Sequence, residues 1–167
     1  MTYEQATYFK LLLLCGYRDE LRQYIDNALV EQNPLSNIIL ELSTCGLDNK
    51  KTLFVLNEFL RQGNSDIDWD KAVFEMVMSF LKKAYDHDNM SMKKITDLMY
   101  QIAVHTDRYH NEPWQTMYYM GDLFDEAKAG YIDKADYQRK FERFIRESIC
   151  LSEYSSVLPK SHFLKDS

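Results

Sequence analysis

The sequence predicts an all-α protein in which about eight helices pair as antiparallel hairpins, forming a compact bundle or a short α-α superhelix. Glycine and proline are scarce, at 5 and 3 of 167 residues. Apolar residues recur at spacings of three and four along almost the whole chain, which is the spacing of one buried helix face. Residues typical of helix starts and stops separate these stripes. We expect one domain over 1–154 and a frayed tail over 155–167.

The first two helices have clear boundaries. Thr2 and Gln5 can form a capping box at the start of a helix over 3–15, and Gly16 is placed to end it. The apolar stripe of the second helix recurs between Leu21 and Leu29. Together these helices are expected to form the first hairpin.

Two shorter segments follow. Asn33 is expected to cap a third helix that has Pro34 at its first position and ends at Gly46. Asp48 is expected to cap a fourth that ends at Gly63, and the polar residues 64–66 form the clearest loop in the sequence.

The second half of the chain is expected to hold four more helices. Asp68 caps a long helix whose stripe runs from residue 69 to 81, and Ser91 starts the next, which the polar residues 106–112 interrupt. Pro113 starts a seventh helix that ends at Gly130. Asp133 then caps an eighth, with apolar residues between 137 and 149.

Charge and composition exclude several classes of protein. Lys and Arg number 20 against 26 Asp and Glu, and the net charge of −6 has the wrong sign for a protein that binds nucleic acid through its phosphates. No apolar run approaches the ~18 residues of a membrane-spanning helix. The segment 1–5 lacks the positive charge of a secretory signal, so we expect a cytoplasmic protein. Cys15, Cys45 and Cys150 are odd in number and far apart, which predicts buried free thiols rather than disulfides or zinc ligands.

Motifs for catalysis are missing from the sequence. It has no Gly-rich phosphate loop, nucleophile elbow, His-Glu-x-x-His or paired Glu-x-x-His, so we expect neither an enzyme nor a cofactor. His105, Asp107 and His110 have a spacing that could serve a metal-dependent hydrolase, but Arg108 beside them favours a polar surface loop. Two further groups of polar residues, at 86–89 with Asp97 and at Asp125, Asp133 and Asp136, lack the ligand pattern of a calcium loop and are expected to be solvated loops and helix caps.

Aromatic residues are more abundant than a core of this size needs. Tyrosine alone accounts for 12 residues and aromatic residues for 14% of the chain, so some rings must reach the surface. Around the seventh helix, aromatic residues lie close in sequence to carboxylates, which favours a contact surface for a basic protein. The candidate partner-binding residues are Tyr109, Trp114, Tyr118, Tyr119, Asp122, Asp125 and Glu126. The alternative is that Trp114 and Tyr118 lie in the core while Tyr119 extends its hydroxyl to solvent.

A small, acidic, all-helical chain with a tyrosine-rich helix and a carboxylate-rich face resembles the immunity proteins that bacteria keep against polymorphic and contact-dependent toxins. The resemblance covers the whole chain in general character, and no motif assigns a residue to a role. It implies that the protein neutralises a basic toxin domain by tight binding. The competing classes are a helical adaptor or regulatory subunit and, on the His105–His110 loop, a metal-dependent hydrolase. The sequence leaves the oligomeric state open.

Overall fold

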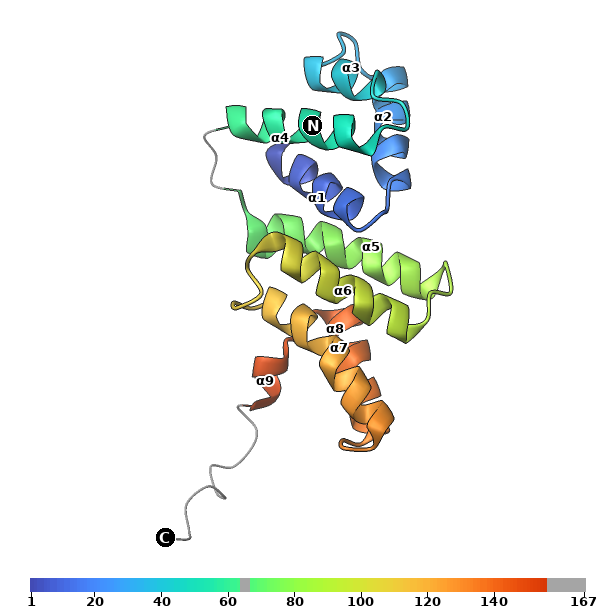
Figure 1. Ribbon diagram of the computed structural model, residues 1–167, viewed down its shortest axis with the longest axis vertical. Coiled ribbons are helices and arrows are strands. Elements are labelled where there is room, and N and C mark those ends of the chain that lie inside the picture. Colours follow the sequence, from blue (N-terminus) through green and yellow to red (C-terminus); the bar gives the residue numbers. More distant parts are fainter. Residues whose placement is uncertain (64–66, 156–167) are drawn as a thin grey trace, which may run out of the picture. The chain divides into compact units, whose positions relative to one another are not determined.

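The structure is a computed structural model that describes residues 1–63 and 67–155, with the side chain of Ser155 excepted. Throughout those residues the regular structure is helical, without strands, so the protein is all-α (Figure 1). The helices are α1 (Tyr3–Leu14), α2 (Asp19–Glu31), α3 (Asn37–Ser43), α4 (Asn49–Gln62), η1 (Trp69–Val73), α5 (Phe74–Asp86), α6 (Met92–Thr106), α7 (Trp114–Ala129), α8 (Lys134–Glu147) and α9 (Leu151–Ser155).

The chain groups into two compact units, Met1–Ser79 and the segment from Phe80 onward. The single domain expected over 1–154 stays a prediction, since two such units can belong to one domain. The expected loop at 64–66 lies outside the described residues, as does the tail expected over 155–167 apart from Ser155. No helix of the described chain is both long enough and apolar enough to cross a membrane.

In the first unit, α1 packs on α4 and η1, and α3 packs on α2 and α4. The capping box at Thr2 is confirmed, because its hydroxyl accepts from the Gln5 amide while the Gln5 side chain accepts from the Thr2 amide. Tyr3 stacks on Phe59 with ring centroids 4.9 Å apart. The Tyr3 ring lies so close to Gly63 that a Cβ built there would be 2.4 Å from it. A side chain at residue 63 would therefore displace this stack.

Several predicted boundaries in the first unit are confirmed, but the third helix differs from the expectation at both ends, and it ends at Ser43 instead of Gly46. Asp48 caps α4 by accepting from the Lys51 amide at 3.0 Å. Asn33, however, does not cap the third helix. That helix begins at Asn37, because the backbone of Ser36 is still extended, at φ −72° and ψ 146°.

The long fifth helix begins differently from the expectation. Asp68 caps it as predicted, accepting from the Lys71 amide at 3.1 Å, but its first turn, η1, is wound as a π-helix before α5 continues. Apolar spacing does not distinguish these two windings, because they differ in which backbone carbonyl each amide reaches. The expected burial is confirmed at Val73, Val77 and Leu81.

In the second unit, α6 and α7 form a tightly packed hairpin, and α7 also packs on α8. The apolar stripe of α6 is buried as predicted, and Trp114, Met117 and Met120 of α7 are fully buried. From α8, the Tyr137 hydroxyl donates to the Met120 carbonyl at 3.3 Å. Burying each large apolar side chain contributes about 1.5–3 kcal/mol, so this stripe is the main source of stability for the hairpin.

A short C-terminal helix, α9, was not expected. Its first amide, from Leu151, donates to the Thr116 hydroxyl at 2.8 Å, and the Ser152 amide donates to the Glu112 carboxylate at 3.4 Å. The same carboxylate accepts from the Thr116 amide and hydroxyl. Tyr154 of α9 lies beneath the cations of Lys140 and Arg143. Helix α9 is therefore held in place by residues that lie far from it in the sequence.

Candidate partner-binding surface

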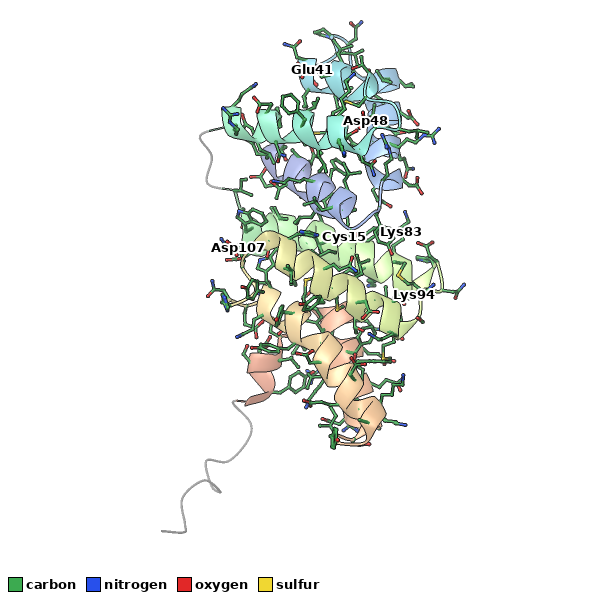
Figure 2. All side chains as sticks on the ribbon, in the orientation of Figure 1. Cys15, Glu41, Asp48, Lys83, Lys94 and Asp107 are labelled. Carbon is green, nitrogen blue, oxygen red and sulfur yellow. The ribbon has the colours of Figure 1, made fainter. Side chains whose placement is uncertain are left out.

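The candidate surface is built on the hairpin of α6 and α7, which the loop 107–113 connects (Figure 1). Asp107 ends α6 in the left-handed conformation, at φ 57°, and Figure 2 shows it where the helix gives way to the loop. The two helices approach closely at Gly121 of α7. A Cβ atom built on Gly121 would lie 3.8 Å from the backbone carbonyl oxygen of Thr96 on α6. The resulting register places side chains of both helices on one face.

Four tyrosines on this hairpin form what we call the tyrosine cluster: Tyr100, Tyr109, Tyr118 and Tyr119. Tyr118 is its centre, with ring centroids 5.0 Å from Tyr100, 5.1 Å from Tyr109 and 5.2 Å from Tyr119. The Tyr109 ring is stacked on Tyr118, whereas Tyr119 meets it edge to face. These separations are those of favourable aromatic pairs. The rings therefore support one another in fixed positions.

The cluster is open to solvent. Tyr100 and Tyr119 expose 43% and 45% of their surface, while Tyr109 and Tyr118 are partly exposed. The neighbouring Tyr100 phenol raises the pKa of Tyr118, and the negative charge of Asp122 adds to the effect. A hydrogen bond between the Tyr100 and Tyr118 hydroxyls raises the pKa of Tyr118 as well, so its phenol stays neutral at physiological pH.

Three exposed carboxylates follow the cluster along α7. Asp122 is four residues beyond Tyr118, and Asp125 and Glu126 come one turn later, so that all three lie along the same side of the helix. Across the part of the chain that the structure describes, none of the three forms an ion pair with a lysine or arginine. The face formed by the tyrosine cluster and these carboxylates is called the tyrosine–carboxylate face below.

One predicted contact residue does not reach this surface. Trp114 is 0% exposed, so the expectation that it contacts a partner is wrong. The reason is that α7 must bury one stripe against α6 and α8, and Trp114 shares that stripe with Met117. The alternative that both Trp114 and Tyr118 lie in the core is confirmed for Trp114. Tyr118, in contrast, is partly exposed at the edge of the buried stripe.

Tyr100 was missed by sequence reasoning. It lies 18 residues before Tyr118, and only the register of the hairpin brings the two rings together. A signal was present, because Tyr100 falls outside the stripe of Ile95, Leu98, Met99 and Ile102 that α6 buries. An aromatic ring outside its own helix's stripe is a candidate for the surface.

Several of the other polar residues considered in the sequence have structural roles. Asp86 accepts from Arg146 at 3.2 Å, Asp97 pairs with Lys93, and Asp133 caps α8 through the Ala135 amide. Asp136 pairs with two cations of α8, which lowers its pKa. Within residues 1–63 and 67–155, no three His, Cys, Asp or Glu side chains gather closely enough to hold a metal ion.

The cysteines are free thiols, as expected, but only Cys45 is buried. Cys15 and Cys150 are partly exposed, which corrects the expectation for both. Desolvation by the surrounding protein raises the pKa of each to about 11. Thiols with such high pKa values are weak nucleophiles at neutral pH.

The described residues thus define an all-α protein that carries an aromatic, acidic face on one hairpin. No family model, curated protein or solved structure matches this chain.

Proposed function

We propose that this protein acts by binding a basic protein partner through the tyrosine–carboxylate face, and not by catalysis. The observation that carries the proposal is the tyrosine cluster, whose mutually packed rings remain exposed beside Asp122 and Glu126, carboxylates that pair with no lysine or arginine in the described chain. Tyrosine is enriched at the energetic centres of protein interfaces, because it combines a large apolar ring with a hydroxyl.

Charge supports the same conclusion. Asp122, Asp125 and Glu126 give the face a negative potential, and the whole chain carries a net charge of −6. Complementary charge accelerates the encounter of two proteins, and aromatic anchors then slow their separation. A basic toxin domain bound by an immunity protein is one form of this function. A basic cellular protein bound by a helical adaptor is the other.

Charge reversal of the carboxylates tests the proposal. The tagged wild-type protein and the triple variant Asp122→Lys, Asp125→Lys and Glu126→Lys are used to capture partners from the cells that make the protein, at low and high salt. We expect the wild type to enrich a basic protein whose capture weakens as salt screens the charges. The triple variant should bind that partner about tenfold more weakly or worse, because like charges now face each other.

A matched control separates the face from net charge. The variant Glu31→Lys, Glu41→Lys and Asp88→Lys changes the charge of the protein by the same amount at exposed positions that do not belong to the tyrosine–carboxylate face. It should capture the partner as well as the wild type, and circular dichroism should show both variants folded. Equal capture by the wild type and the first variant at low salt would reject the face. Mass spectrometry of the captured protein distinguishes a toxin domain from another cellular partner.

A further inference from the structure

The seam between α6 and α7 already holds one cation of its own chain. The Lys93 ammonium lies 5.8 Å from the centroid of the Phe124 ring and pairs with Asp97 one turn further along α6. The bond to Asp97 raises the pKa of Lys93, and the charge of Asp125 adds to this effect. This arrangement combines a cation, an aromatic face from α7 and carboxylates from both helices.

A second site between α6 and α7, at Tyr118 and Asp122, also combines an aromatic ring with a carboxylate, but no cation of this chain occupies it in the described residues. Tyr118 lies six residues before Phe124, which corresponds to about 9 Å along the helix, and Asp122 is close enough to influence its pKa. Tyr100 supplies a further exposed ring from α6. Throughout the described residues, no lysine or arginine of this chain lies over the rings of the tyrosine cluster or pairs with Asp122.

We propose that the partner fills this second site with an arginine, whose guanidinium stacks on the tyrosine cluster and pairs with Asp122. The inference rests on the proposed function and names the chemistry by which the face recognises its partner. Both recognition elements are present together, a π-face and a carboxylate, as they are around Lys93. The geometry differs in that the tyrosine cluster is more open, with two of its rings more than two-fifths exposed.

Arginine fits this site better than lysine. A guanidinium is planar, so it can lie flat on an aromatic ring while its edge donates two parallel hydrogen bonds to one carboxylate. An ammonium is a compact and strongly hydrated charge, and it gives up water to approach an exposed ring. Because a hydrated ammonium gains little from an exposed ring, most of the stacking interaction counts toward arginine, which corresponds to a preference of up to about fivefold in affinity.

Two peptides of equal length and charge test the inference. One carries several arginines in a Gly- and Ser-rich background, and the other carries lysines at the same positions. Each is titrated into the ¹⁵N-labelled full-length protein while amide chemical shifts are followed. We expect shifts concentrated in α6, α7 and the loop between them, and a dissociation constant about fivefold lower for the arginine peptide. Equal affinity for the two peptides, binding elsewhere, or no binding at all would overturn the inference.

Substitutions assign the preference to particular groups. Tyr118→Leu should remove the preference for arginine, while Asp122→Asn should weaken the binding of both peptides. Tyr131→Leu is the matched control for the ring, because Tyr131 is 83% exposed on the turn after α7 and lies outside the cluster. Asp88→Asn is the control for the carboxylate. A preference for arginine that survives Tyr118→Leu in folded protein would show that the rings do not cause it.

The outcomes for the two proposals are separable. If charge reversal abolishes binding of the native partner but the two peptides bind equally well, the proposed function is supported and the proposed arginine contact is rejected. A preference for the arginine peptide together with a partner indifferent to charge reversal would reject the proposed function.

Discussion

Replacing Trp114 with alanine tests the division between core and surface in α7. The indole is 0% exposed, and a buried tryptophan of this kind removes about 150–250 Å² from water. At about 25 cal/mol per Å², that area corresponds to about 4–6 kcal/mol. Measured costs of truncating buried aromatic residues are about 3–5 kcal/mol. We therefore expect Trp114→Ala to lower the free energy of unfolding by about 4 kcal/mol.

Tyr119→Ala is the matched comparison, because it truncates an aromatic ring of the same helix that is 45% exposed. Among the residues that the structure describes, its ring packs against one other ring, edge to face on Tyr118, and this contact is worth about 0.5–1.5 kcal/mol. We expect it to cost about 1 kcal/mol. Urea denaturation followed by far-UV circular dichroism measures both variants. A Trp114→Ala variant that loses no more stability than Tyr119→Ala would refute the assignment of Trp114 to the core.

Three further predictions concern local features. Asp68→Ala should lower stability by about 1 kcal/mol, since it removes the carboxylate that caps η1, and thermal unfolding will measure the loss. Gly130→Ala should cost about 1 kcal/mol because residue 130 has φ +84°, whereas Gly121→Ala should raise stability by up to about 1 kcal/mol, since its helical site has room for a methyl group. In a Cys150→Ser background, alkylation of Cys15 should accelerate about tenfold per pH unit from pH 8 to 10. The reason is that burial raises the pKa of the Cys15 thiol to about 11, so the reactive thiolate is the minor form throughout this range. An alkylation rate that levels off below pH 9 would contradict the raised pKa.

Helix boundaries were predictable from the sequence where the chemistry that sets them is local. Thr2, Asp48, Asp68 and Asp133 each satisfy an amide within three residues of themselves, so the sequence alone contains both partners. The predicted cap at Asn33 was wrong because several neighbouring residues are also able to end one helix and start the next. The sequence alone does not determine which of them does so. Such a choice depends on how the flanking helices pack.

Tertiary contacts account for the features that the sequence did not predict. Helix α9 is held by bonds to Thr116 and Glu112, which lie 35 and 40 residues before their partners. The meeting of Tyr100 with Tyr118 depends in the same way on hairpin register. Spacing within α7 was enough to bring Tyr118 and Tyr119 close to Asp122, because that proximity is a property of one helix. Spacing alone could not separate the buried Trp114 from these surface residues.

The packing within the tyrosine cluster bears on how strongly it can bind. An interface residue that is free to rotate costs about 0.5–1.5 kcal/mol when a partner immobilises it. Tyr118 is already held by rings on three sides, and Tyr109 is held between Tyr118 and His110, whose ring centroid is 4.1 Å away. Much of the cost of ordering these side chains is therefore met in the unbound protein. Substitutions that loosen the cluster and remove one of its rings, such as Tyr100→Ala on α6, should accordingly increase the dissociation rate of the complex. The salt-dependent association rate should stay nearly unchanged, because the carboxylates of α7 are intact.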